Sequence, residues 1–165
     1  MNAVHIHLLL NHVPVIGAVI AFLLLGAAAF RRGDELVRAA LALYVLIGLA
    51  ALVVFLTGEP AEEAIESLPG FSDSIVERHE EFALVSTVSL GIAATLALVA
   101  LIVHRSREMP RWILRGGLVI GLGLVTLVGY TANLGGQIRH TEIRPGGVSA
   151  GGIESPASDV ARRDD

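Results

Sequence analysis

Four long runs of residues without a charge constrain this chain more than any other feature of its sequence. They cover residues 13–30, 39–56, 82–103 and 116–134, and each has 18 residues or more. A bilayer with a hydrocarbon core about 30 Å thick is crossed by a helix of about 20 apolar residues. The runs therefore predict an all-α integral membrane protein, a bundle of four transmembrane helices.

The composition agrees with this class and excludes several kinds of site. Hydrophobic residues make up 53% of the chain and the mean hydropathy is +0.68, whereas soluble domains are roughly 45 to 50% apolar. The chain has no cysteine, which excludes disulfides, thiolate metal sites, iron–sulfur clusters and haem attached through cysteine. No nucleic-acid-binding signature is present, so the lipid bilayer is the expected partner.

We predict a single transmembrane domain, followed by a tail. The domain covers residues 1–144, and its spans are expected at approximately residues 8–30, 37–57, 75–104 and 112–136. A short surface helix is predicted in the 58–81 loop, because Pro60 opens the helical segment "AEEAIESL" and Pro69 and Gly70 close it. Residues 145–165 are rich in Gly, Ser, Pro and charge, which predicts a disordered tail.

The first span is expected to be a retained helix. It lacks the basic segment that precedes the apolar part of a cleaved signal, and its apolar part is too long for one. Pro14 falls near the start of this span. A missing N–H is tolerated there, so we expect no kink at Pro14.

The arginines predict which way the chain crosses the membrane. Residues 31–38 hold three Arg and residues 104–115 hold four, while residues 58–81 hold one Arg and eight acids. Short basic loops remain cytoplasmic. Both termini and the acidic loop are then expected on the extracytoplasmic side, against which Arg139 and Arg144 count as contrary evidence.

The end of the last span carries a row of polar residues. The row has intervals of four, three, four and three, and it consists of Thr126, Tyr130, Asn133, Gln137 and His140. Residues at this spacing share one face of a helix. Because hydrocarbon penalises unpaired polar groups, we expect this face to point inward, toward the other helices or a water-filled cavity.

Five of the six histidines are expected at the extracytoplasmic ends of their helices, and His104 alone at the opposite side. The five are His5, His7, His12, His79 and His140. Imidazoles that gather near carboxylates and amides suit a metal ion, a haem or a proton-handling site. For His5, His7 and His104 we favour a simple interfacial role, in which the ring spans the polar and apolar zones.

The remaining three histidines are the candidate ligands. We expect His12, His79 and His140 to bind a cofactor, either haem b or a divalent ion of Zn, Cu or Fe, with Glu80 as a further metal ligand. We expect these ligands to be oriented by hydrogen bonds with four further residues, Asn11, Tyr130, Asn133 and Gln137.

Four segments between the spans carry a resemblance to a known family. "HLLLNHVPVIG", "LTGEPAEEAIE", "ERHEEFAL" and "TANLGGQIRHTEIR" resemble an uncharacterised bacterial family of four-helix integral membrane proteins, and more distantly a broader membrane family of unknown function. The resemblance covers about residues 3–144. It implies a multi-pass protein of the bacterial inner membrane, and it implies no activity. The matching polar positions are His12, Glu59, His79, Glu80, Gly135, Gly136 and His140.

Three functions remain open at this point. The first is the metal or haem site. The second is a non-catalytic structural or accessory subunit, as a homo-oligomer or within a larger membrane complex, in which polar contacts stabilise helix packing. The third is an enzyme or carrier for a lipid or small solute, with His79 or His140 as general base and Glu80 as its partner. No nucleophile motif, HExxH motif or phosphate-binding loop is present, so catalysis is not favoured and no catalytic residue is identified.

Overall fold

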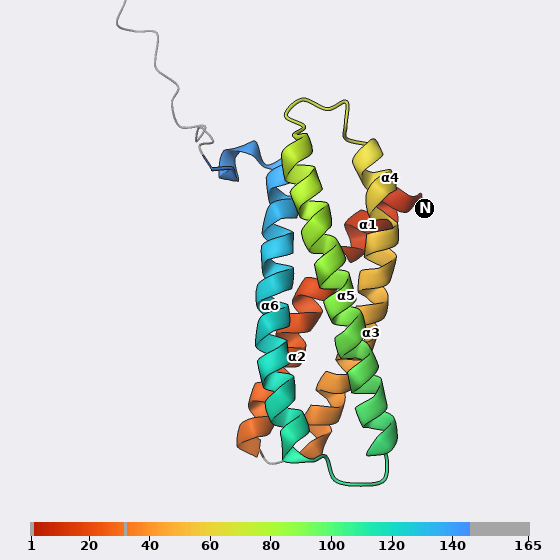
Figure 1. Ribbon diagram of the computed structural model, residues 1–165, viewed down its shortest axis with the longest axis vertical. Helices are drawn as coiled ribbons and strands as arrows, with labels where there is room; N and C mark the ends of the chain where they lie inside the picture. The colour runs from red at the N-terminus through yellow and green to blue at the C-terminus, as the bar shows by residue number, and fades with distance from the viewer. Residues whose placement is uncertain (1, 32, 146–165) are drawn as a thin grey trace, which may run out of the picture.

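The structure is a computed structural model that describes residues 2–31 and 33–145 (Figure 1). The helices of this part follow in the order α1 Ala3–Leu10, α2 His12–Arg31, α3 Asp34–Leu56, α4 Gly58–Glu63, α5 Asp73–Val103 and α6 Arg111–Arg139, and the 3₁₀-helix η1 covers Thr141–Ile143. No strand occurs among the described residues. The predicted disordered tail lies outside them, apart from Pro145.

The all-α prediction is confirmed, and four helical segments are long and apolar enough to cross a membrane. These are Ala3–Arg31, which comprises α1 and α2, and the helices α3, α5 and α6. Several helices run past the predicted spans, since α5 begins at Asp73 and α6 ends at Arg139. Their first and last turns are polar and were therefore not part of the apolar runs.

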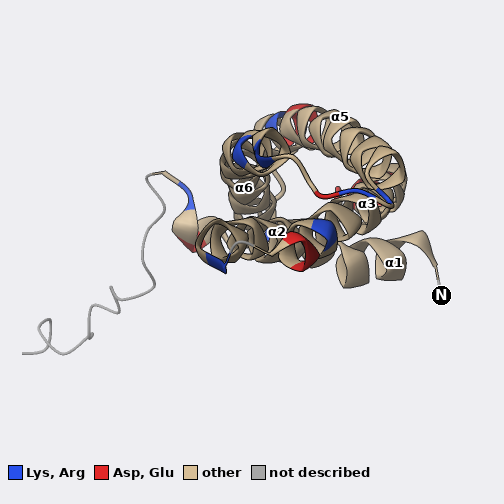
Figure 2. Cartoon of the chain, turned by 90° about the horizontal axis from the view of Figure 1, so that it is seen from below, with Lys and Arg blue, Asp and Glu red and all other residues tan. Residues whose placement is uncertain are grey.

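The long helices form a ring in which each contacts two others. α2 packs on α3 and α6, and α5 packs on the same two helices from the other side. Seen from below, α1 lies outside this ring (Figure 2), where it contacts α3 and α4. A short helix does occur in the predicted segment as α4, but it begins at Gly58, before Pro60, and ends at Glu63, so Pro69 and Gly70 do not close it.

The expectation that Pro14 leaves the first helix straight is wrong. The helix begins as early as Ala3 and is interrupted at Asn11, where α1 ends and α2 begins. Pro14 is therefore in the interior of the segment, where it lacks the N–H that would bond the carbonyl of Leu10 and where its ring crowds that carbonyl. The break directs α1 away from the ring and onto the outer side of α3.

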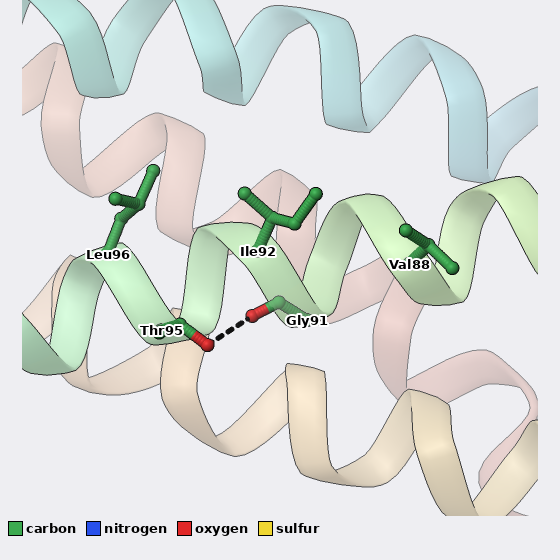
Figure 3. A pocket seen from close by; sticks show the side chains of 5 residues that line it. All are labelled: Val88, Gly91, Ile92, Thr95 and Leu96. Atoms are coloured by element: carbon green, nitrogen blue, oxygen red, sulfur yellow. Dashed lines mark hydrogen bonds between the residues drawn. The ribbon is translucent and has the colours of Figure 1, made fainter.

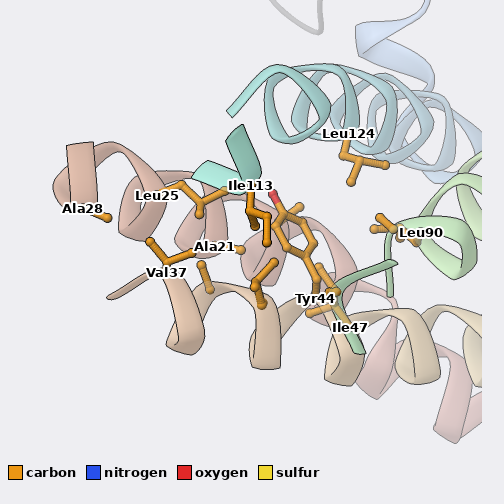
Figure 4. Packing of buried hydrophobic residues seen from close by; sticks show 14 of the residues in the cluster. Ala21, Leu25, Ala28, Val37, Tyr44, Ile47, Leu90, Ile113 and Leu124 are labelled. Carbon is orange, nitrogen blue, oxygen red and sulfur yellow. The ribbon is translucent and has the colours of Figure 1, made fainter. Parts of the chain in front are cut away.

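Small residues allow the helices of the ring to approach closely. Ala18, Ala21 and Ala28 of α2 are buried, together with Leu25, and Figure 4 shows Ala21, Leu25 and Ala28 gathered with Tyr44 of α3 and residues of α6. Without a hydrophobic drive between helices in lipid, close packing of small residues is a principal source of their association.

The two basic connections meet at one end of the ring. The guanidinium of Arg38 donates to the carbonyl oxygens of His104 and Arg107, at 2.9 and 2.7 Å. The carboxylate of Asp34 accepts the backbone N–H of Met109 at 2.7 Å. The start of α3 is thus bonded to the connection between α5 and α6, so the Arg-rich segments lie at the same end of the molecule, as the sequence predicts.

We expect Gly48→Ala to destabilise the bundle. A Cβ at Gly48 would lie 2.5 Å from Cβ of Ala94 and 3.2 Å from the carbonyl oxygen of Leu90, so α3 and α5 would have to separate. Overpacking of this kind costs about 1–3 kcal/mol. The free energy of unfolding, measured by circular dichroism in mixed detergent micelles, checks this expectation.

Gly26→Ala is the matched control, because a Cβ at Gly26 meets nothing within 4 Å. Alanine favours the helix over glycine by about 1 kcal/mol, so this variant should be as stable as the unchanged chain or more stable. Equal effects of the two substitutions would contradict the close approach of α3 and α5.

Candidate functional site

Polar side chains from four helices meet at the end of the bundle opposite the basic connections. α1, α4, the start of α5 and the end of α6 lie together at the top of Figure 1. We call this region the histidine end, because His7 and His79 are its partly buried imidazoles. Each of them bonds to the backbone of another helix.

His79 connects α5 to α6. Its Nδ1 lies 3.0 Å from the carbonyl oxygen of Thr131. A carbonyl only accepts, so Nδ1 carries the hydrogen and, in the neutral ring, Nε2 keeps its lone pair free. Gly135 stands one turn after Thr131, and a Cβ there would lie 3.0 Å from Cε1 of His79. With a Cβ at this position the ring of His79 would have to shift.

His7 connects α1 to the end of α3. Its Nδ1 lies 3.0 Å from the carbonyl oxygen of Val54 and 3.5 Å from the hydroxyl of Thr57. The last four carbonyls of a helix have no partner within it, and His7 and Thr57 both donate to this group. The lone pair of Nε2 in the neutral ring is again free for another partner.

The two imidazoles lie at the same end of the bundle. They come from α1 and α5 and are 72 positions apart in the chain. Since each ring is oriented through Nδ1 by a backbone carbonyl, both present Nε2 as the nitrogen that can bind a ligand. This arrangement is the usual one for histidines that bind metals, whose second nitrogen is held by a carbonyl or carboxylate.

An acidic pair lies beside these imidazoles. The carboxyl groups of Glu62 on α4 and Glu80 on α5 share a hydrogen bond, which raises the pKa of Glu62 to about 7. Partial burial and the negative charges of Glu80, Glu66 and Glu59 raise it further. The pair therefore holds a proton near neutral pH and loses it in mild alkali.

The structure does not bring the predicted ligands together. His12 is exposed at the start of α2, and His140 is exposed beyond α6, where its Nδ1 lies 2.9 Å from Glu142. The carboxyl group of Glu80 bonds that of Glu62 and does not join the predicted histidines at a common site. Within the described residues, no three side chains of His, Asp or Glu could hold a metal ion between them. Of the three predicted ligands, His79 alone is partly buried at the histidine end.

The side chains of the four residues predicted to orient the ligands bond neither His7 nor His79. Tyr130 and Asn133 are exposed on α6, with Tyr130 edge-on to Phe82, and Gln137 donates to Asn133 at 2.7 Å. Asn11 stands at the break between α1 and α2. Its Oδ1 is buried and accepts no hydrogen bond from the part of the chain that the structure describes.

The expectation that the polar row of α6 points inward is wrong. Thr126, Tyr130 and Asn133 are exposed, whereas Thr131 and Leu134 are buried. The hydroxyl of Thr131 bonds that of Ser86 at 2.8 Å, inside the α5–α6 contact. The inward face of α6 is therefore nearly opposite the predicted one, and it offers His79 the carbonyl of Thr131.

Sequence reasoning undervalued His7 and missed Thr131 and Glu62. The available signal for His7 was its i,i+4 pairing with Asn11, and for Thr131 it was the polar spacing of His79 and Ser86 on the facing helix. No sequence signal pairs Glu62 with Glu80, because the contact depends on how the 58–73 segment folds back.

A groove on α5 is a poor alternative site. It has a volume of about 440 Å³ and is lined by Val88, Gly91, Ile92, Thr95 and Leu96, all from one helix. Figure 3 shows that the hydroxyl of Thr95 is directed to the carbonyl of Gly91, at 2.8 Å. The groove is therefore apolar and offers no free polar group for chemistry.

No family model matches the chain, and no curated protein or solved structure is significantly similar to it.

The acidic pair predicts that the α4–α5 contact weakens as the pH rises. Because the pKa of Glu62 is raised from 4.5 to about 7 in the folded chain, folding takes up a proton between these values. The contact is therefore most stable below about pH 4.5 and loses stability up to about pH 7. Hydrogen exchange of the backbone amides of Ile65 and Glu66, which bond the carbonyl of Glu62, should show less protection at pH 8 than at pH 5.

Two substitutions control this measurement. Glu62→Gln should remove most of the pH dependence, while Glu63→Gln, at an exposed neighbour on α4, should preserve it. Unchanged protection between pH 5 and pH 8 in the original chain, after correction for intrinsic exchange, would contradict the shared proton.

Proposed function

We propose that this protein is an integral membrane protein that binds haem between His7 and His79. The membrane assignment is supported by four helical segments of sufficient length and hydropathy. Large apolar side chains are also exposed along all of them, among them Leu23, Leu46, Ile92 and Val119. Soluble monomers rarely expose apolar surface on this scale.

The observation that carries the haem proposal is the common geometry of the two imidazoles. Each donates Nδ1–H to a backbone carbonyl of a neighbouring helix, of Val54 or of Thr131. This bond fixes the ring and makes Nε2 a better electron donor. Paired neutral imidazoles from different helices are a means by which bundles hold haem.

The number of available ligands favours haem over a bare metal ion. A structural zinc site takes four protein ligands and a catalytic site three, and the described residues offer no group of three. Haem brings four nitrogens of its own and takes one or two axial ligands from the protein. Two histidines are therefore enough, and when bound the haem would supply one-electron redox chemistry.

The positions of the basic connections indicate on which side of the membrane the proposed site lies. The Arg-rich connections lie together at the end opposite the histidine end, and basic loops remain in the cytoplasm. The histidine end, and with it α1, then faces the extracytoplasmic side of the bacterial inner membrane.

Removing either imidazole should weaken haem binding by about 10-fold or more, since loss even of a residue that only orients a ligand costs about 10- to 100-fold. The test is titration of the purified protein with haemin, followed through the Soret band, for the original chain and for His7→Ala and His79→Ala. His5→Ala is the control, because the His5 ring is exposed and bonds Asn2 at 2.7 Å.

Two results would contradict this ligand pair. One is loss of binding in His12→Ala and His140→Ala together with retention in His7→Ala, which would restore the ligands expected from the sequence. The other is an original chain that takes up no haem and holds no metal after purification, which would leave a non-catalytic membrane component.

Gly135→Ala should lower haem affinity without removing a ligand. Its Cβ would lie 3.0 Å from Cε1 of His79 and would displace the ring from the carbonyl of Thr131. Gly136→Ala is the adjacent control, because its nearest contact would be Cδ1 of Ile143 at 3.6 Å. Equal haem affinities of the two variants would count against the fixed ring of His79.

The orientation can be tested separately, because the chain has no cysteine. Ser67→Cys, in the segment after α4, should react with a membrane-impermeant maleimide on intact cells. Ser106→Cys, between α5 and α6, should react only after permeabilisation, because the adjacent arginines hold this connection inside. Reaction of both cysteines from the same side would contradict the proposed crossing.

A further inference from the structure

The outward face of α6 carries a regular row of small and polar residues. The row alternates intervals of three and four and consists of Gly116, Val119, Gly123, Thr126, Tyr130, Asn133, Gln137 and His140. None of these residues is buried. The residues that α6 buries are others, namely Ile113, Gly121, Leu124, Val128, Thr131 and Leu134.

The glycines of this row have no role in the packing of one chain. A Cβ at Gly116 or Gly123 would meet nothing within 4 Å, whereas a Cβ at Gly117 or Gly121 would press against Leu25 or Tyr44. Glycine inside a helix costs about 1 kcal/mol relative to alanine. Gly26, Gly91 and Gly129 are equally open, so what distinguishes Gly116 and Gly123 is that they share one face with the polar residues of the row, where a second helix can approach α6 closely.

Among the described residues, the side chains of Thr126, Asn133 and Gln137 form hydrogen bonds only within α6. The hydroxyl of Thr126 donates to the carbonyl of Leu122 in its own helix. Gln137 donates its amide to Oδ1 of Asn133, which leaves the amide N–H groups of Asn133 and the side-chain oxygen of Gln137 without a hydrogen-bond partner in the described part of the chain. Facing lipid, such groups are unfavourable until another helix satisfies them.

We propose that this row is the contact through which two copies of the chain associate, with their α6 helices parallel across a two-fold axis. The proposal rests on the membrane crossing proposed above and does not depend on haem. Alternating intervals of three and four are the heptad pattern of a left-handed helix pair. The two copies would therefore cross at about 20°.

A second copy is the partner that the chemistry of the row favours. Copies inserted in the same direction hold the row at the same depth, and the side chain of Gln137, which bonds Asn133 of its own copy, then lies at the level of Asn133 in the other. The free amide N–H groups of Asn133 then face the free side-chain oxygen of Gln137 in the other copy, and the reverse bond forms by symmetry. Lower in the row, Gly116 and Gly123 allow the two backbones to approach closely.

Single cysteines in this cysteine-free chain test the contact in native membranes. Thr126→Cys and Asn133→Cys should each form a disulfide-linked dimer on mild oxidation, since residues near the two-fold axis bring their Cβ atoms within about 4.5 Å. Ala132→Cys is the matched control. It is also exposed and has nearly the same depth as Asn133, but it lies about 100° around the helix, and it should form several-fold less dimer.

A second substitution tests how closely the two α6 helices approach each other and leaves the introduced cysteine in place. Gly123→Leu, combined with Thr126→Cys, should reduce the disulfide-linked dimer several-fold. Gly91→Leu on α5, at another glycine whose Cβ would meet nothing within 4 Å, should leave it unchanged. Haem titration of the Gly123→Leu variant should match that of the original chain, because the row lies on the face of α6 opposite His79.

Three outcomes would overturn the proposal. They are equal cross-linking of Ala132→Cys and Asn133→Cys, no dimer from either row position in protein recovered from the membrane fraction, and cross-linking to a different protein. Absence of the chain from the membrane fraction would instead contradict the membrane crossing itself, so the two failures are distinguishable.

Discussion

Hydrogen bonds from side chains to the backbone carbonyls of another helix or connection hold both ends of the bundle together. At the basic end, Arg38 donates to the carbonyls of His104 and Arg107. At the histidine end, His7 and His79 donate to the carbonyls of Val54 and Thr131. Side chains that bond to backbone are held by the helices themselves, so the two imidazoles keep their orientation without a network of other side chains.

The number of membrane-length helical segments, and the end of the molecule at which each loop lies, could be predicted from the sequence. Both follow from the position of charges, since an uncharged run long enough to cross a bilayer becomes one helix and successive helices reverse direction. The contact of Arg38 with residues 104 and 107 brings together two loops that this reasoning already places at one end. Such conclusions need composition and length, and they do not need the packing of individual side chains.

Rotation of a helix about its axis could not be predicted in the same way. The spacing of Thr126, Tyr130 and Asn133 shows that they share a face, and it does not show where that face points. The direction is decided by close packing, in which Gly121 makes room for Tyr44 and Gly135 for His79. Likewise, the break at Asn11 depends on how far the helix extends before Pro14. This break places His7, rather than His12, against the end of α3.

The two faces of α6 are not independent of one another. Thr131 and Gly135 hold the ring of His79 on the inner face, while Asn133 and Gln137 lie within the same two turns on the outer face. A helix moves as a rigid unit over such a distance, so a rotation that turned Asn133 and Gln137 inward would carry the carbonyl of Thr131 away from His79. The bond of His79 to this carbonyl, together with the close approach at Gly135, therefore also determines which face α6 turns outward.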